Sequence, residues 1–208
     1  MIRGRHNAHR HRPWWYENRS DRARGHDQTL FRRSVPTPGG DYEQVLTTIT
    51  SLVSEAAVQA GLRGSVGIGT PGTMSAKTGR LKNANSVYLI GKDFAVDIAA
   101  RLRRDVRVAN DANCFALSEA VDGAGAGQQV VLGVILGTGV GAGIVVDQKV
   151  MHCANGSAGE FGHNPLPWVR EHESFVVRCY CGKTGCIESF LSGPGLQRAY
   201  EVRSGRCE

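Results

Sequence analysis

The stretch "QVVLGVILGTGVGAGIVVDQKVMH", residues 129–152, contains two apolar, β-rich runs on either side of a glycine-rich turn. Two such runs joined by a short glycine turn are typical of a β-hairpin. Upstream of the hairpin, short apolar runs alternate with two longer segments, 41–61 and 92–105, in which apolar residues recur at helical spacing. Alternating strands and helices favour an α/β fold.

The chain has 208 residues, enough for one large domain or two small ones. The order of its patterns suggests three parts. We expect an irregular, ill-packed basic segment at residues 1–33 and a small α/β domain at 34–112. A partial second α/β domain, with the hairpin and a cysteine-rich loop, is expected at 113–208.

The net charge of +6 is confined to the first part of the chain. Residues 1–33 hold nine arginines and three acidic residues, whereas the rest of the chain has 16 basic and 16 acidic residues. Because the body of the protein is neutral, we expect no nucleic-acid surface on it. No apolar run is long enough to span a bilayer, and no signal peptide follows Met1. We therefore expect a soluble cytoplasmic protein with no membrane partner.

The turn "LGTGVGAG", residues 136–143, is a candidate phosphate site. Its glycines allow positive φ angles and give an anion access to backbone N–H groups, and Thr138 adds a hydroxyl donor. The string lacks the lysine of a Walker A loop and joins two strands rather than a strand and a helix. A phosphate cradle and a plain glycine-rich turn are equally compatible with these residues.

The string "VANDAN", residues 108–113, places Asn110 and Asp111 at the end of a short predicted strand, where α/β proteins often bind ligands. A carboxylate there could take a proton from a substrate hydroxyl. The same two residues also suit the N-cap of the helix that follows. From these residues alone, the cap is the favoured interpretation.

The string "CYCGKTGC" brings Cys179, Cys181 and Cys186 close together in sequence. In a cytoplasmic chain this spacing favours a zinc site over disulfides, and Gly182 and Gly185 would let the loop turn around one centre. His163 is the best fourth ligand. The weaker candidates are His152 and His172. A set of buried thiols is the alternative.

Several polar loops could line a ligand site. "GIGTPG" at residues 67–72 and "NANS" at 83–86 follow predicted strands, although a simple turn is the favoured interpretation of each. Glu160 and Glu188 flank the cysteine loop, where they could accept hydrogen bonds from a polyol or be solvated.

Taken together, these strings resemble the ROK family of sugar kinases and sugar-responsive repressors. The matching stretches run in family order from about Leu30 to Gly195. They are "GIGTPGTMSAKTG", "NANS", "VANDANCFALSEAVDGAGAG", "LGTGVGAGIVVD", "GSAGEFGHNPLPW" and "CYCGKTGCIESFLSG". Within the family, bacterial fructokinases are the nearest likeness, and N-acetylglucosamine kinases share most of the rest.

The resemblance implies an actin-like two-domain ATPase fold and an ATP-dependent, Mg²⁺-assisted hexose kinase. Asp111 would be the general base. The sugar would contact Gly69, Thr70, Pro71, Gly72, Asn85, Asn110, Glu160, His163 and Glu188. The turn of Gly137, Thr138 and Gly139 would hold ATP phosphates. A structural zinc would be bound by His163, Cys179, Cys181 and Cys186, with one ring nitrogen of His163 on the metal and the other left to face the sugar.

Fructose is the sugar that the resemblance favours, with fructose 6-phosphate as the product. N-acetylglucosamine or another hexose remains the alternative substrate, and a sugar-responsive regulator or an inactive remnant the alternative function. A regulator would need an N-terminal helix-turn-helix, and residues 1–33 lack the helical periodicity for one. A homodimer is compatible with the family.

The basic segment departs from the family pattern, in which a first phosphate hairpin with Asp, Gly-Gly and Thr should precede "LFRR". Tryptophan has a single codon, TGG. Trp14, Trp15 and the first base of the Tyr16 codon therefore read GGT GGT, or Gly-Gly, one base later. The neighbouring codons permit the shifted peptide G-I-D-L-G-G-T-K-T-E-V-I-A-L, which is that missing hairpin.

We therefore hypothesise a frameshift that opens before about His9 and closes between Gly25 and Thr29, with a genuine basic tail as the alternative. Codons that do not spell the shifted peptide would rule the frameshift out. Members of the family also continue beyond the position of Glu208. We accordingly expect a fold incomplete at both ends, with weak or no kinase activity in these 208 residues.

Overall fold

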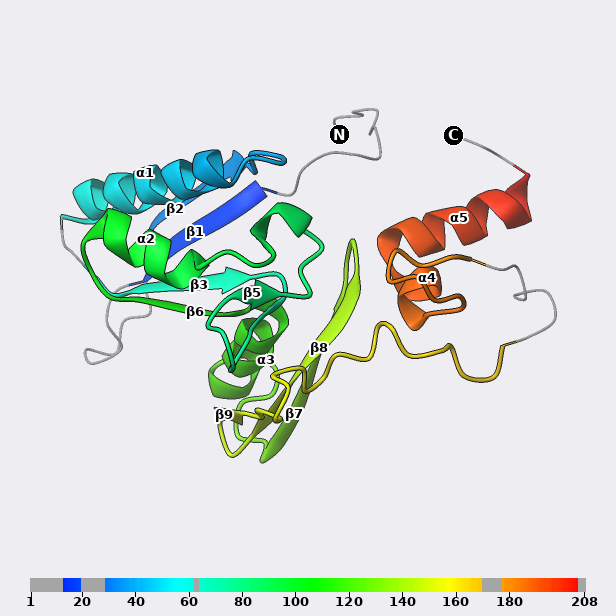
Figure 1. Cartoon of the computed structure of the whole chain (residues 1–208). Coiled ribbons are helices and arrows are strands. Elements are labelled where there is room, and N and C mark those ends of the chain that lie inside the picture. Colours follow the sequence, from blue (N-terminus) through cyan, green and yellow to red (C-terminus); the bar gives the residue numbers. More distant parts are fainter. Residues whose placement is uncertain (1–12, 20–28, 62–63, 170–176, 206–208) are drawn as a thin grey trace. The chain divides into compact units, whose positions relative to one another are not determined.

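The computed structural model describes residues 13–19, 29–61, 64–169 and 177–205 (Figure 1). The chain forms two compact units, Met1–Val108 and Ala109–Glu208. The boundary lies before Asn110 and Asp111, slightly earlier than the sequence analysis expected, so both residues belong to the second unit. Among the described residues, no helix has the length and apolar character needed to cross a membrane.

The first unit begins with an antiparallel pair of strands. Strand β1 (Pro13–Arg19) pairs with β2 (Thr29–Pro36), with Pro13 opposite Pro36. Of the segment at 1–33 that we expected to be irregular, the structure describes 13–19 and 29–33, and both ranges are strand. Most of the basic segment, at 1–12 and 20–28, lies outside the described residues.

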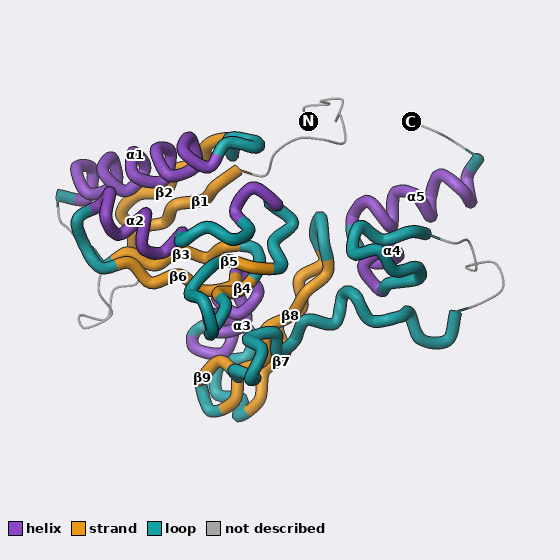
Figure 2. Tube along the Cα trace, in the orientation of Figure 1, coloured by secondary structure: helices purple, strands orange, loops and turns teal. Residues whose placement is uncertain are grey.

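Helix α1 (Tyr42–Ala60) confirms the helix predicted from its apolar spacing. It begins where Asp41 accepts a hydrogen bond from the backbone N–H of Gln44 (3.1 Å), and it ends at Gly61, whose φ of 65° is left-handed. Its apolar stripe is buried and consists of Val45, Leu46, Ile49, Leu52, Val53 and Ala56. The helix lies against β1, β2 and α2 (Figure 2).

The remaining elements of the first unit are short. They are β3 (Val66–Thr70), β4 (Thr73–Met74), β5 (Leu81–Lys82), the 3₁₀ turn η2 (Val87–Leu89), α2 (Phe94–Leu102) and β6 (Val106–Asn110). Strands β3 and β6 form one sheet, and β4 and β5 form another. The core of this unit joins the α1 stripe to the fully buried Leu89, Phe94 and Ile98.

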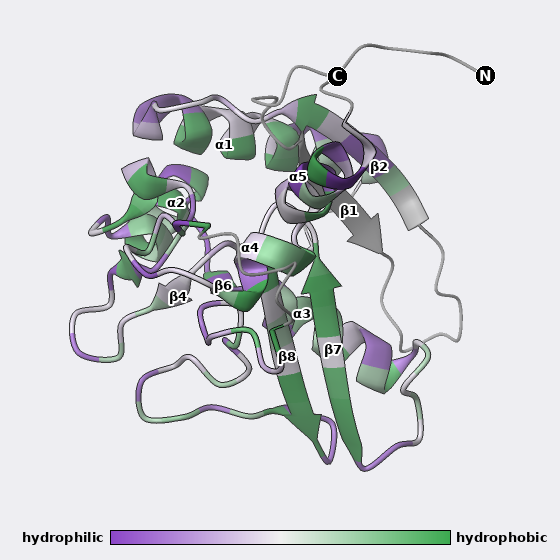
Figure 3. Ribbon diagram, turned by 90° about the vertical axis from the view of Figure 1, so that its right-hand side faces the viewer, coloured by the Kyte–Doolittle hydropathy of each residue, from purple (hydrophilic) through white to green (hydrophobic). Residues whose placement is uncertain are grey.

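The second unit is built on the predicted hairpin. Strands β7 (Val130–Leu136) and β8 (Val140–Val146) are antiparallel, and β9 (Lys149–Val150) extends the sheet beyond β8. Both hairpin strands are strongly apolar (Figure 3). Every second residue of β7 is nevertheless exposed, namely Val130, Leu132, Val134 and Leu136. The period-two pattern thus directs one face of β7 to solvent and the other to the core.

Helix α3 (Asp111–Val121) packs closely on the core face of this sheet. Its buried residues are the small Ala112, Ala116 and Ala120. A Cβ placed on Gly133 or on Gly143 would lie 2.7 Å from the Cβ of Ala116. The strand glycines therefore allow the helix its close approach. Two further helices, α4 (Ile187–Leu191) and α5 (Gly193–Ser204), follow the cysteine loop.

Candidate functional site

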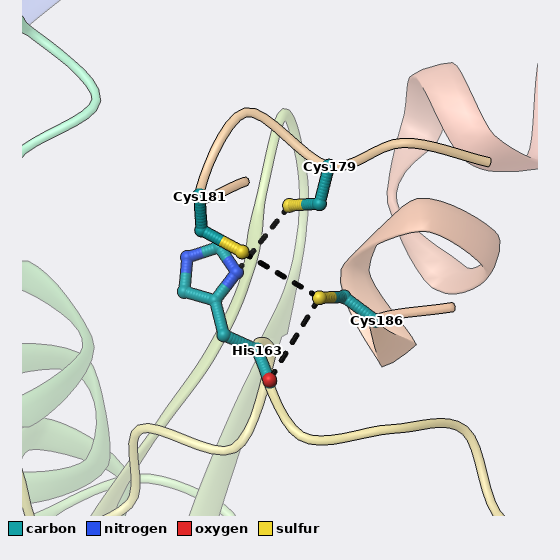
Figure 4. Close-up of side chains that lie close together, drawn as sticks. All are labelled: His163, Cys179, Cys181 and Cys186. Carbon is teal, nitrogen blue, oxygen red and sulfur yellow. Dashed lines mark hydrogen bonds between the residues drawn. The ribbon is translucent and has the colours of Figure 1, made fainter. Parts of the chain in front are cut away.

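The four predicted metal ligands converge. One ligand atom from each of His163, Cys179, Cys181 and Cys186 lies within 4.8 Å of the others (Figure 4). The Nδ1 atom of His163 is 3.5 Å from the Sγ atom of Cys179, and the Sγ atoms of Cys181 and Cys186 are 3.6 Å apart. Tetrahedral zinc with bonds of about 2.3 Å to sulfur separates its ligands by roughly 3.8 Å. The donor set and its spacing therefore fit zinc.

The cysteine loop is folded by its own backbone. Gly182 and Gly185 adopt left-handed φ angles of 88° and 71°, which lets the loop reverse as the sequence predicted. The N–H of Cys179 donates to the carbonyl of Lys183 (2.8 Å), and the N–H of Leu166 donates to that of Gly185 (2.8 Å). The second bond fastens the loop to the segment that carries His163.

The thiols of the cluster have contrasting environments. Burial raises the pKa of the Cys186 thiol to about 12, and this thiol donates to the backbone carbonyl of His163 (3.7 Å). The backbone N–H of Lys183 lowers the pKa of the exposed Cys181 thiol. Since a metal binds thiolates, its binding would have to displace the proton of Cys186. Among the described residues no other histidine joins the cluster, and His172 lies outside them.

Three carboxylates gather beside this cluster. Partial burial raises the pKa of Glu160 although its side chain stays accessible. The negative charge of Asp111 raises it further, His163 lowers it, and Glu188 adds a smaller rise. These effects place the acids of α3, α4 and the loop after β9 in one electrostatic neighbourhood. The family resemblance implies a sugar site at these same acids.

The N-cap of α3 is Asn110, whose Oδ1 accepts the N–H of Asn113 (3.0 Å). Asp111 is exposed at the first helical position, and its Oδ1 accepts the N–H of Ala112 (2.9 Å). The cap interpretation is therefore confirmed for Asn110. Asp111, by contrast, presents its carboxylate at the helix start, where the aligned N–H groups favour a negative charge.

Glu188 connects the cysteine loop to the glycine turn. It is buried, which makes the solvated interpretation wrong, and its Oε2 accepts the N–H of Val140 (2.9 Å). A Cβ on Gly139 would lie only 2.6 Å from this oxygen. The N–H of Gly193 also donates to the carbonyl of Gly137 (2.7 Å). The turn that was predicted to hold phosphate is thus fixed by the start of α4 and of α5.

The glycines of this turn do not have the positive φ angles that we predicted for a phosphate cradle. None of Gly137, Gly139, Gly141 and Gly143 has a positive φ. Gly139 and Gly143 are instead sites of close approach, to Glu188 and to α3 respectively. The N–H groups of Gly137 and Val140 are already donated within the protein, to the carbonyl of Gly139 (2.9 Å) and to Glu188. The absence of a side chain, rather than a special conformation, explains Gly139 and Gly143.

The other predicted sugar residues belong to the first unit. Gly69, Thr70, Pro71 and Gly72 lie at the end of β3 and in the turn that follows. Gly72 has a φ of 81°, and a Cβ there would lie 2.5 Å from the carbonyl oxygen of Lys82. The loop at 69–72 is therefore held against the segment that leads to Asn85. Thr70 is buried, and its hydroxyl donates to the carbonyl of Pro71 (3.4 Å).

Tyr180 is a site residue that the sequence analysis missed. Its hydroxyl is 3.1 Å from the Nε2 of His163, and the two rings meet edge to face at 5.1 Å. A sugar that contacts His163, as the resemblance implies, would have to share Nε2 with this hydroxyl. Partial desolvation, followed by the charge of Glu188, raises the pKa of Tyr180 to about 12. The position of Tyr180 between two predicted ligands, Cys179 and Cys181, is the sequence feature that could have identified it as a site residue.

Comparison with known proteins shows which proteins this chain resembles. The family model of the ROK family matches residues 24–208, and this match begins within the basic segment. An N-acetyl-D-glucosamine kinase of Pectobacterium atrosepticum is 46% identical over 182 residues, which cover 86% of this chain and 60% of that protein. The chain thus spans about 60% of the length of this curated relative.

Solved structures agree on the fold. A ROK family glucokinase from Streptomyces griseus, in complex with glucose and AMPPNP, matches with a TM-score of 0.73 and 30% identity over 86% of this chain and 55% of that one. A ROK family transcriptional regulator, a homolog of the E. coli MLC protein, matches with a TM-score of 0.69 and 24% identity over 86% of this chain and 46% of that one, a likeness of fold alone. The expected actin-like ATPase fold, present in part, is confirmed.

Proposed function

Because the chain belongs to the ROK family, we propose that it functions as a sugar kinase that phosphorylates N-acetyl-D-glucosamine with ATP. The 46% identity to an N-acetyl-D-glucosamine kinase supports this sugar over fructose, which the sequence resemblance had favoured. The observation that carries the kinase assignment is the family match over residues 24–208, and it is supported by the charges of Asp111 and Glu188 acting on Glu160 and by the contact of Glu188 with the glycine turn.

Asp111 is the proposed general base. Its carboxylate stands at the start of α3, oriented by the N–H of Ala112, where it can accept the proton of an attacking sugar hydroxyl. Such a base typically contributes about 10²–10⁴-fold to the rate.

Glu160 and Glu188 are proposed to accept hydrogen bonds from other sugar hydroxyls. On family grounds we also keep Asn110, His163, Asn85 and the loop at 69–72 as proposed sugar contacts. For His163, whose Nε2 contacts Tyr180, such a contact would have to share that atom.

The turn of Gly137, Thr138 and Gly139 is the proposed phosphate site. The assignment rests on the family resemblance, and Glu188 holds the turn in place by accepting the N–H of Val140. Phosphoryl transfer depends mainly on positioning and on charge neutralisation, which Mg²⁺ supplies when bound with ATP. A structural zinc is proposed at His163 and the three cysteines, on the strength of the donor set and its spacing.

Calorimetric titration of sugars into the full chain tests this proposal without requiring turnover. We expect N-acetyl-D-glucosamine to bind more tightly than fructose or glucose. Glu160→Gln should weaken the binding by roughly 10- to 100-fold, the cost of losing a charge-assisted hydrogen bond. Glu201→Gln, on α5 and outside the carboxylate group, is the matched control and should leave the affinity unchanged. Tighter binding of fructose would contradict the choice of sugar.

A further inference from the structure

Tyr180 lies in an unusual position for an aromatic residue. Its side chain is 71% exposed, so burial of apolar surface does not account for its placement. Instead its hydroxyl contacts the Nε2 of His163 (3.1 Å), and its ring meets the edge of the imidazole. The same imidazole presents Nδ1 to the Sγ of Cys179. His163 is therefore held on both sides, by the cysteine cluster and by Tyr180.

The contact with Tyr180 bears on which ring nitrogen of His163 carries the proton. A neutral histidine carries one N–H, and only the unprotonated nitrogen can bind a metal. For Nδ1 to serve the cluster, the proton must reside on Nε2, and that N–H needs an acceptor. The phenolic oxygen of Tyr180 is at hydrogen-bonding distance to accept it.

From this geometry we infer that Tyr180 is a positioning residue for the metal cluster. Its oxygen accepts the Nε2–H of His163, which selects the tautomer and fixes the ring orientation that turns Nδ1 toward the cysteines. This inference rests on the proposed zinc site and goes beyond its four ligands.

Tyr180→Phe tests the hydroxyl alone, because phenylalanine keeps the ring and its edge contact. Tyr200→Phe, at an exposed position of α5, is the matched control. Zinc affinity and the rate of zinc release to a chromogenic chelator are measured on the full chain, and circular dichroism verifies that each variant is folded. We expect Tyr180→Phe to bind zinc roughly 10- to 100-fold more weakly, as is typical when the hydrogen-bond partner of a metal-bound histidine is lost. Tyr200→Phe should match the unaltered chain.

Nitrogen NMR of the labelled histidines adds a readout that general destabilisation would not produce. With zinc bound, His163 of the unaltered chain should be in the Nε2–H tautomer, and in Tyr180→Phe this proton should exchange faster with solvent. Zinc affinity and exchange that are equal in the two chains would overturn the role of Tyr180 while leaving the metal site intact. An unaltered chain that binds no zinc would overturn both.

Discussion

Gly139 is the residue at which the glycine turn packs against Glu188. A Cβ there would lie 2.6 Å from the Oε2 of Glu188, whereas at Gly141 the nearest atom would be 4.0 Å away, the Cβ of Ala112. Glu188 cannot retreat without giving up the N–H of Val140. The lack of a side chain at position 139 thus leaves space for Glu188 to join the metal loop to the glycine turn.

We expect Gly139→Ala to reduce the free energy of unfolding by about 1–3 kcal/mol, the usual cost of overpacking with loss of a hydrogen bond to a charged group. Gly141→Ala, which has room, should cost much less. Urea denaturation followed by circular dichroism measures both. Equal stabilities for the two variants would show that Glu188 does not press on the turn.

Glu160 gives the site a pH dependence. Burial, with Asp111 as the next cause, raises its pKa above that of an ordinary glutamate. The unfolded chain therefore releases this proton at a lower pH than the folded chain does. Stability linked to Glu160 is fully present below the ordinary value of about 4.3 and is lost as the pH rises through the raised pKa.

Glu160→Gln should remove this dependence. In urea titrations at several acidic pH values, the stability of the unaltered chain relative to the variant should fall as the pH rises through that window. A difference that stays constant, or that grows with pH, would contradict the environment assigned to Glu160.

At the scale of elements, the cysteine loop connects three segments. Backbone N–H groups of Leu166, Ile187 and Glu188 donate to the carbonyls of Gly185, Asn164 and Gly162. A Cβ on Gly162 would lie 2.2 Å from the carbonyl oxygen of Val140, so the segment at 159–166 lies directly against β8. The proposed zinc would stabilise the cysteine loop, this segment and the start of α4 as a single unit.

Removal of zinc by a chelator should therefore loosen 159–166 and 178–191 together. Hydrogen–deuterium exchange with mass spectrometry should show faster exchange in both segments and no change in α1 of the first unit. Exchange that rises in the cysteine loop alone would show that the loop does not support the segment carrying Glu160 and His163.

Periodicity predicted the elements well, because it depends on local sequence. Helical spacing gave α1 together with its end at Gly61, and the paired apolar runs gave β7 and β8. The ligands of the metal cluster were also predictable, since three cysteines lie within eight residues and only the histidine is distant.

The features that sequence reasoning missed depend on contacts between distant residues. We interpreted Gly139 through the freedom of its own backbone. The structure shows instead that a side chain there would collide with Glu188, which bonds to Val140 from 48 residues further along the chain. Tyr180 is adjacent to two ligands, but its relation to His163 appears only once the loop has folded back. Strand β1 lacks an apolar period and is defined by its pairing with β2.

At the scale of the whole molecule, the proposed chemistry is concentrated in the second unit. Asp111, the other two acids, the glycine turn and the metal cluster all lie within Ala109–Glu208. The first unit holds the loop at 69–72 and Asn85, which stay predictions from the family resemblance. The account's central claim is consequently a claim about Asp111 and the sugar on which it acts.

The most direct test is mass-spectrometric detection of the phosphorylated sugar formed from ATP by the full chain and by Asp111→Asn. The comparison is a ratio, so it holds even when turnover is slow. We predict that N-acetyl-D-glucosamine is phosphorylated in preference to fructose, and that Asp111→Asn lowers the rate by about 10²–10⁴-fold. An undiminished rate in Asp111→Asn would contradict the account of the site, and a preference for fructose would contradict the proposed substrate.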